Sequence, residues 1–366
     1  MLSELILCIL CAIDPVRLTA IDRLVQDAIK EGQAPGAVVV VVRDSKVAYR
    51  KAFGMRAKDE PMTLDTLFDL ASLTKPIATA TSVFKLVEQG KLTLDDPVRK
   101  WVPGFREGIT LRHLLLHTSG YPAGGPAKEF QNGKEAMLKY LIRVAEKIEP
   151  DKKFVYTDLG FILLGHIVEQ ASGQSLDAFA AREIFTPLKM RDTGFRPNKE
   201  LQPRIAPTLP ELRGIVHDSR ARVMGGVAGH AGLFSTADDL VLYAEALLAN
   251  KLLKPETTKQ FTTPVKVPLE KPLPDMAQGL RTLGWDARTA FSSNRGDFFA
   301  GFGHTGFTGT SIWIDPDSRT TIILLTSRLQ NPKGNVVALR RAVANAVARA
   351  IRTPPYPAGR DKPIDD

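Results

Sequence analysis

Apolar residues recur every three or four positions after Asp14, which is the spacing of one face of a helix. The residues on this face are Leu18, Ile21, Leu24, Val25, Ala28 and Ile29. Asp14 suits the N-cap of such a helix and Pro15 its first turn, and the pattern stops before Gly32. It then changes to two strand-like runs, 36–43 and 46–53, joined by a tight polar turn. We therefore expect a helix followed by two paired strands.

The C-terminal part of the chain supplies the same kinds of element. Strand-like runs at 309–315 and 319–327 flank the turn Asp315-Pro-Asp-Ser318, and a helix is predicted from about 332 to 351. One face of that helix carries Val336, Leu339, Val343 and Val347, which we expect to pack on a sheet. Its arginines could instead bind a membrane surface, but we expect most of them to face water. These arginines are Arg340, Arg341, Arg349 and Arg352.

The two ends of the chain therefore supply strands and helices to one sheet, whereas the middle is mainly helical and rich in loops. We predict an α/β part made of 15–80 and 275–352 and a mainly helical part at 81–274. An apolar segment at 1–14 and a tail at 353–366 complete the chain. The segment from Pro264 to Pro274 carries four prolines, so we expect an irregular connection there and not an ordered element.

Candidate chemistry begins with Ser72 and Lys75 in the run Asp69-Leu-Ala-Ser-Leu-Thr-Lys-Pro76. On a helix these two residues share a face, so the lysine amine can reach the serine hydroxyl. A neighbouring base makes serine a useful nucleophile. This four-residue motif is weak evidence by itself, because a helix start with an exposed lysine would show the same two residues at the same spacing. The small and apolar run 76–87 favours a buried helix that begins at the serine, with free N–H groups able to hold an oxyanion.

Two further short segments follow, Tyr156-Thr157-Asp158 and His304-Thr305-Gly306. With Ser72-x-x-Lys75 they resemble the motifs of the serine β-lactamase and penicillin-binding-protein superfamily. The resemblance is to the branch of class C β-lactamases, low-molecular-weight D-alanyl-D-alanine peptidases and family VIII carboxylesterases. Segments 110–120 and 225–239 are similar to connecting segments of such proteins. The resemblance covers roughly residues 15 to 350 and implies an α+β fold, with an antiparallel sheet flanked by N- and C-terminal helices plus a mainly helical subdomain.

The resemblance also implies roles for these residues. Ser72 would attack a carbonyl to form an acyl-enzyme, while Lys75 and Tyr156 would share the work of general base and acid. The backbone N–H groups of Ser72 and Phe307 would form the oxyanion hole. Substrate-binding positions would be Asp158, His304, Thr305 and Gly306. To act as a base near neutral pH, Lys75 would need its pKa lowered by roughly three units from about 10.4.

Two positions depart from the best-known pattern of the superfamily. His304 stands where many β-lactamases have lysine, and with an ordinary pKa of about 6.5 it is mostly neutral at neutral pH. Asp158 stands where asparagine is common, and its carboxylate would hold Lys75 charged and repel an anionic substrate. Both changes count against efficient β-lactam hydrolysis. We find no glutamate placed as in class A enzymes, so deacylation would have to use Tyr156 and Lys75.

The expected function is that of a metal-independent serine hydrolase without a cofactor. Its expected substrate is an ester or amide related to cell-wall peptides, as for a D-alanyl-D-alanine peptidase, with slow β-lactamase activity. One alternative is a family VIII type carboxylesterase acting on small esters. Another class is a penicillin-recognising receptor or pseudoenzyme that is acylated once, but the chain shows neither a membrane-spanning apolar run nor a signalling domain. The oligomeric state stays open.

Composition adds limits. A chain of 366 residues with 44% hydrophobic content can bury a large core. The net charge of +9 is spread along the chain without a nucleic-acid motif, so we expect solvated basic faces. Cys8 and Cys11 lie in the apolar run 5–13, which argues against a redox pair and lacks the basic start and cleavage site of a signal peptide. The resemblance implies a periplasmic or secreted protein, and a cytoplasmic one if this run is not a signal.

Other candidates have ordinary structural explanations. His113 and His117 are four residues apart, which suits zinc, but no third ligand is evident. Tyr121 and His230 lie in glycine-rich loops and could line a cleft, although loop glycines serve turns equally well. Three tryptophans suit the core or the cleft equally: Trp101, Trp285 and Trp313.

Overall fold

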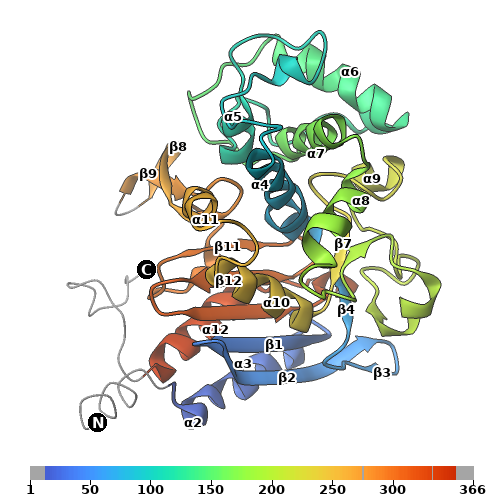
Figure 1. Ribbon diagram of the computed structural model, residues 1–366. Coiled ribbons are helices and arrows are strands. Elements are labelled where there is room, and N and C mark those ends of the chain that lie inside the picture. The colour runs from blue at the N-terminus through green and yellow to red at the C-terminus, as the bar shows by residue number, and fades with distance from the viewer. Residues whose placement is uncertain (1–12, 274–275, 332, 352–366) are drawn as a thin grey trace.

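The computed structural model describes residues 13–273, 276–331 and 333–351. The Cys8-x-x-Cys11 pair, most of the apolar segment 1–14 and the tail 353–366 lie outside the described residues. Figure 1 shows a large sheet with helices packed beneath it and a mainly helical region above it. Within the described ranges, no helix is both long and apolar enough to cross a membrane.

The large sheet has nine strands, and every pair of neighbouring strands in it is antiparallel. Their order is β3-β2-β1-β13-β12-β11-β10-β9-β8. The strands are β1 (Gly36–Arg43), β2 (Lys46–Ala57), β3 (Glu60–Pro61), β8 (Val265–Leu273), β9 (Met276–Arg281), β10 (Asp286–Arg288), β11 (Phe302–Thr305), β12 (Ser311–Asp315) and β13 (Thr320–Leu325). Val38 of β1 pairs with Leu325 of β13, so the two ends of the chain meet inside one sheet, as predicted.

Strand β1 is buried along its whole length because both faces of the sheet are covered. Side chains alternate between the faces, so Val39 and Val41 pack in one cluster and Val38 and Val40 in another. The helices of the first cluster are α2 (Pro15–Leu18), α3 (Ala20–Lys30) and α12 (Val337–Ala350). In α12, Leu339, Val343 and Val347 are buried, as the sequence predicts.

The segment Pro264 to Pro274 was predicted to be irregular, and that prediction is wrong. Residues Val265–Leu273 form β8, which pairs with β9 and ends the sheet. Proline is tolerated on an edge strand because its missing N–H does not have to pair with a second neighbour. Strand β8 comes from the segment assigned to the helical part, and the boundaries of the two parts remain a prediction.

The helical region surrounds α7, whose apolar residues face neighbours on nearly every side. Residues Leu159 to Leu164 are all buried there. Between α3 and α12, the α-helices of the described residues are α4 (Thr81–Glu88), α5 (Leu111–Leu116), α6 (Gly133–Ala145), α7 (Asp158–Ser172), α8 (Leu176–Ala180), α9 (Ser219–Val223), α10 (Ala237–Leu248) and α11 (Pro255–Thr262). Trp285 and Trp313 are fully buried core residues, and Trp101 packs half-buried against the core.

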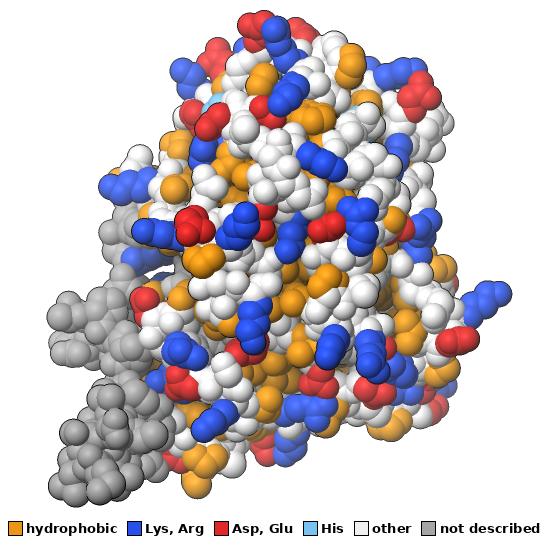
Figure 2. Space-filling view, in the orientation of Figure 1, with side chains coloured by type: hydrophobic (Ala, Val, Ile, Leu, Met, Phe, Trp, Pro, Cys, Tyr) orange, Lys and Arg blue, Asp and Glu red, His pale blue; other side chains and the backbone are white. Residues whose placement is uncertain are grey.

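A second, four-stranded sheet with the order β5-β7-β4-β6 lies beside the helices. Its strands are β4 (Leu67–Asp69), β5 (Gly194–Phe195), β6 (Ile205–Ala206) and β7 (Leu233–Ser235). Strand β4 ends three residues before Ser72. On the face shown in Figure 2, Lys and Arg side chains are interspersed with Asp and Glu, so this face carries mixed charge and no single basic patch.

Candidate active site

Ser72 lies in a tight turn directly after β4. A 3₁₀ turn at Ala71–Leu73 leads into a π-helical turn at Lys75–Ala80 and then into α4, so the predicted buried helix is present but changes pitch twice. Ala71 adopts a left-handed backbone conformation with φ of 46°, which is costly for a residue with a side chain. The Asp69 carboxylate accepts the Ala71 N–H at 2.8 Å and stabilises this conformation. Strained backbone of this kind often occurs at functional sites.

Lys75 is fully buried, and its ammonium group has three partners. Its Nζ donates to Ser72 Oγ at 2.9 Å and to the His230 carbonyl at 3.2 Å, and it lies 2.8 Å from Asp158 Oδ1. The predicted approach of Lys75 to Ser72 is therefore present.

Burial alone would lower the pKa of Lys75, but the Asp158 carboxylate and the Tyr156 hydroxyl outweigh burial and raise it. The lowered pKa that Lys75 would need to act alone as a base is therefore not found. The competing expectation, that Asp158 holds Lys75 charged, agrees with this shift. Burial likewise raises the pKa of Asp158, and the charge of Lys75 more than offsets it.

The Tyr156-Thr157-Asp158 segment forms the start of α7. Thr157 is the N-cap, and its Oγ1 accepts the Leu159 N–H at 3.2 Å. The ring of Tyr156 packs between His117 and Phe291, with ring centres 4.7 and 4.8 Å away. Lys75 Nζ lies 5.1 Å from the centre of the Tyr156 ring, so the tyrosine is adjacent to the Ser72 and Lys75 pair.

The His304-Thr305-Gly306 segment ends β11 on the opposite wall. His304 is buried, and its Nδ1 contacts the Thr305 carbonyl at 2.9 Å. Burial, with the charges of Arg281 and Lys75, holds the pKa of His304 well below its ordinary value, so the ring is neutral at neutral pH, as expected. A Cβ on Gly306 would lie 2.6 Å from the Leu70 carbonyl oxygen, so only glycine fits this close approach to the Ser72 turn.

The Ser72 turn and the 305–310 loop are tied together by two threonines. Thr308 Oγ1 donates to the Asp69 carbonyl at 2.7 Å, and Thr310 Oγ1 donates to the Leu70 carbonyl at 3.1 Å. This brings the predicted oxyanion-hole residues, Ser72 and Phe307, to one side of the cleft. Among the hydrogen bonds of the described residues, neither backbone N–H has an acceptor. Both are therefore free to donate to a substrate oxygen.

These residues line one cleft of about 840 Å³. Its walls include Ser72, Tyr156, Asp158, His304, Thr305, Gly306 and Phe307, with Lys75 buried behind them. His230 also lines the cleft, as anticipated. Tyr121 does not, because it is fully buried in the helical region and its hydroxyl donates to the Leu141 carbonyl at 2.7 Å. The anticipated role of Tyr121 in the cleft is therefore wrong.

Three arginines line the cleft and were not singled out as site residues: Arg220, Arg328 and Arg340. Arg220 Nη1 donates to Asp158 Oδ2 at 2.9 Å and so holds the carboxylate from the side opposite Lys75. Arg340 of α12 is buried instead of facing water, and its Nη2 donates to the carbonyls of Gly306 and Thr310 at 3.0 and 2.9 Å. The helical spacing contained a signal for Arg340, because it lies four residues after Val336 and three before Val343, on the buried face.

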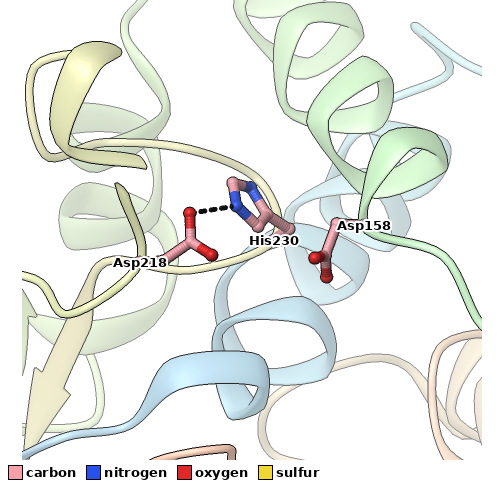
Figure 3. A group of neighbouring side chains, drawn as sticks. All are labelled: Asp158, Asp218 and His230. Carbon is pink, nitrogen blue, oxygen red and sulfur yellow. Dashed lines mark hydrogen bonds and ion pairs between the residues drawn. The ribbon is translucent and has the colours of Figure 1, made fainter. Parts of the chain in front are cut away.

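Asp158, Asp218 and His230 are the described residues that come closest to a metal-ligand cluster, with ligand atoms within 4.8 Å of one another. Figure 3 shows Asp218 pointing at His230 Nε2, a contact of 2.8 Å, while Asp158 lies apart from both at the start of α7. The Asp158 oxygens already face Lys75 and Arg220. A metal ion would have to displace these two cations, so the donor set fits an ion-pair network better than a metal site.

The histidine pair considered for zinc has separate partners. His113 Nε2 lies 2.9 Å from Asp151, and its Nδ1 accepts the Thr110 N–H at 3.0 Å. His117 Nδ1 accepts the Thr157 N–H at 3.1 Å. Each ring therefore supports a different part of the backbone.

Comparison with known proteins identifies the family of this chain. The family model described as Beta-lactamase matches residues 21–346. The chain belongs to the β-lactamase family. Both the resemblance seen in the motifs and the predicted α+β fold are confirmed, and the protein is a serine hydrolase of the β-lactamase type.

Two relatives and a solved structure are similar to this chain over most of its length. A protein of Escherichia coli (strain K12) named "Putative D-alanyl-D-alanine carboxypeptidase" is 32% identical, over 86% of this chain and 83% of that protein. An N-acetylmuramyl-L-alanine amidase of Bacillus subtilis (strain 168) is also 32% identical, over 86% of this chain and 82% of its own length. The octameric penicillin-binding protein homologue from Pyrococcus abyssi has the same fold, with a TM-score of 0.72 and 24% identity over 92% of this chain and 78% of that chain.

Proposed function

We propose that the protein hydrolyses an alanyl amide bond of a cell-wall peptide, with Ser72 as the nucleophile of an acyl-enzyme mechanism. The observation that carries the proposal is the 2.9 Å contact of Lys75 Nζ with Ser72 Oγ inside the cleft. In the first step Ser72 Oγ attacks the amide carbon, and the N–H groups of Ser72 and Phe307 stabilise the oxyanion. The leaving amine departs with a proton, and water then cleaves the acyl-enzyme.

The proton from Ser72 passes to the pair formed by Tyr156 and Lys75. We treat the pair as one base, whose active form lacks one proton in total. Asp158 favours that remaining proton on Lys75, because its carboxylate lies 2.8 Å from the ammonium group. The phenol oxygen of Tyr156 is then the atom that accepts the proton of Ser72, and the charged Lys75 orients Oγ and stabilises the phenolate. Tyr156 returns the proton to the leaving amine.

The choice of a cell-wall amide is supported by the names of two relatives. The two relatives described above are named for a D-alanyl-D-alanine carboxypeptidase and an N-acetylmuramyl-L-alanine amidase, and both names refer to alanyl amides. The neutral His304 provides no fixed positive charge for a substrate carboxylate, so we expect β-lactams to be poor substrates. A peptide that ends in D-Ala-D-Ala also carries a carboxylate, so this feature does not by itself favour such a peptide over a β-lactam.

Hydrolysis of a small ester is the second candidate. It is favoured by the two exposed aromatic side chains at the cleft, Phe307 at 61% and Phe291 at 44% exposure. An apolar acyl or alcohol group would bury part of this surface, at a gain of about 25 cal/mol per Å². The same Ser72 chemistry would apply, since an ester carbonyl is attacked in the same way.

The test compares three substrates with wild type and Ser72→Ala: a muramyl peptide that ends in D-Ala-D-Ala, p-nitrophenyl butyrate and a penicillin. Product masses identify which amide of the muramyl peptide is cut, and intact-protein mass spectrometry detects acyl adducts. We expect steady release of an alanyl product by wild type and none by the folded alanine variant. Ester turnover alone would make the carboxylesterase assignment correct, and a single stoichiometric burst would indicate a receptor. Activity retained in Ser72→Ala would remove Ser72 from the mechanism.

A further inference from the structure

His117 lies behind the cleft, at the end of α5. It is the C-cap of that helix and adopts a left-handed conformation with φ of 59°. Its ring is only 1% exposed and does not line the cleft. A left-handed backbone is uncommon for residues other than glycine, although histidine and asparagine adopt it more readily than most. A buried polar ring in a costly backbone conformation indicates that His117 has a specific role at this position.

Three contacts connect His117 to the segment that carries Tyr156. The His117 carbonyl accepts the Val155 N–H at 3.0 Å, and its Nδ1 accepts the Thr157 N–H at 3.1 Å. Between these two hydrogen bonds, the His117 ring packs against the ring of Tyr156, with centres 4.7 Å apart and planes inclined by 35°. His117 therefore holds the residues on both sides of Tyr156 and one face of its ring.

The His117 ring also packs on Phe161 of α7, with ring centres 5.0 Å apart. Phe161 is fully buried in the core around α7. Tyr156 is thus connected through His117 to α7, whose residues Leu159 to Leu164 are all buried. A group that transfers protons has to be held within a few tenths of an ångström of its partner, so such support affects rate directly.

We propose that His117 is a positioning residue that holds the Tyr156 hydroxyl in place for proton transfer to and from Ser72. The inference rests on the proposed function, because it assumes that Tyr156 accepts that proton. His117 touches no substrate and acts only through Tyr156. Its contribution requires two properties together, an acceptor at the position of Nδ1 and a flat ring against the tyrosine.

The ionisation of His117 agrees with this role. Burial, with the charges of Arg281 and Lys75, holds the pKa of His117 well below its ordinary value, so the ring is neutral and Nδ1 is free to accept the Thr157 N–H. The ring proton then lies on Nε2, which has no hydrogen-bond partner among the described residues. A protonated ring would carry hydrogens on both nitrogens and would lose the bond to Thr157.

Two substitutions separate the required properties. His117→Asn keeps an acceptor near the position of Nδ1 and tolerates the left-handed backbone, but it loses the ring. His117→Phe keeps the ring and loses the acceptor. His113→Gln is the matched control, since His113 caps the same helix and contacts Asp151, away from the cleft. Each variant is also made in a Tyr156→Phe background, so that the dependence on the tyrosine hydroxyl is measured directly.

The measurements are steady-state hydrolysis of p-nitrophenyl butyrate and the rate at which a fluorophosphonate labels Ser72. General acid–base groups contribute about 10²- to 10⁴-fold, so we expect kcat to fall about tenfold in His117→Asn and about a hundredfold in His117→Phe, with little change in KM. His113→Gln should keep the wild-type kcat. In the Tyr156→Phe background the substitutions at His117 should cost less than about twofold, because residues that act as a unit are not additive.

Equal losses in the wild-type and Tyr156→Phe backgrounds would overturn the proposal and leave His117 as a purely structural residue. Wild-type kcat in both His117 variants would also overturn it. If His117→Phe fails to fold by circular dichroism, the asparagine variant alone completes the double-mutant cycle. Failure of the proposed function gives a different result, namely fluorophosphonate labelling that persists in Ser72→Ala.

Discussion

The Lys75 ammonium group lies 2.8 Å from Asp158 Oδ1 and 2.9 Å from Ser72 Oγ, so one buried cation joins the predicted nucleophile to a carboxylate. Removing a charge from water is costly unless it is paired, and Asp158 is the pairing group. The same carboxylate keeps the proton on Lys75 in the absence of substrate. In the proposed mechanism, Asp158 would therefore set the pH at which the Tyr156 and Lys75 pair becomes active as a base.

The first prediction concerns Asp158→Asn. Asp158 raises the pKa of Lys75, so its removal lets the pair lose its proton at lower pH, and the acidic limb of the pH profile of kcat/KM should move to lower pH. Arg220→Gln removes the second cation that contacts Asp158 but leaves the negative charge of Asp158 in place. It should therefore not move the acidic limb to lower pH. Steady-state rates across the acidic and neutral range test this. An unmoved limb in Asp158→Asn would mean that a different group controls the profile.

The second prediction concerns Asp69 and stability. Burial raises the pKa of Asp69 from 3.8 to about 6, although its oxygens accept the N–H groups of Ala71 and His217 at 2.8 and 2.7 Å. The folded state therefore binds this proton more tightly than the unfolded state, and the contribution of Asp69 to stability is lost as pH rises from about 4 to about 6. A shift of about two units corresponds to about 3 kcal/mol.

Asp69→Asn removes this titration, so the comparison is a difference between two proteins. The unfolding free energy of wild type minus that of the variant should decrease by up to about 3 kcal/mol as pH rises through this range. Urea unfolding at several pH values measures it. A carboxylate that is not coupled to Asp69, such as Asp158, has a lowered pKa and cancels in the subtraction. A difference that grows with pH would contradict the prediction.

The third prediction concerns Arg340, which supports the loop that precedes Phe307. Arg340→Met removes the two hydrogen bonds to the carbonyls of Gly306 and Thr310. Hydrogen bonds that involve a charged group contribute about 1.5–3 kcal/mol, so we expect a loss of about 2 kcal/mol of stability and a slower acylation of Ser72. Arg349→Met is the control on the same helix, because Arg349 is exposed. Equal unfolding free energies and equal labelling rates in the two variants would exclude this role.

Much of the architecture could be predicted because it depends on local patterns. The apolar runs that became β1 and β13 and the spacing of Leu339, Val343 and Val347 require burial wherever they occur. The approach of Lys75 to Ser72 also follows from sequence separation alone, since the two residues share one helical turn. These predictions needed no knowledge of distant contacts.

The features that were missed depend on pairing between distant segments. Four prolines argue against a strand until the position of β8 at the sheet edge is known. The contact of Lys75 with Asp158, 83 positions away in the chain, was expected, but only because of the family resemblance and not from a local pattern. The hydrogen bond that His117 Nδ1 accepts from the Thr157 N–H also joins two segments that are distant in the sequence. Local composition carries little information about such contacts, and they decide the electrostatics of the site.

The last prediction concerns Gly229, where the glycine-rich loop that carries His230 lies against α7. A Cβ at this position would lie 1.9 Å from the Phe161 carbonyl oxygen and 2.9 Å from the Gly165 nitrogen. Both are backbone atoms, so the loop itself would have to move. Its movement would disturb the His230 carbonyl, which accepts from Lys75, and the Gly229 carbonyl, which accepts from Thr79 Oγ1 at 2.7 Å.

Gly229→Ala should therefore cost about 1–3 kcal/mol or more of stability, as overpacking does, and should also lower kcat. Gly194→Ala is the matched control, because Gly194 has no atom within 4 Å of the added Cβ and no positive φ. Alanine in that strand should leave stability unchanged or slightly raised, since glycine is unfavourable there by roughly 0.5–1 kcal/mol. Urea unfolding and hydrolysis rates of the two variants distinguish a local steric conflict from a general effect of replacing glycine. Equal behaviour of the two variants would show that the loop can retreat from α7 without disturbing Lys75.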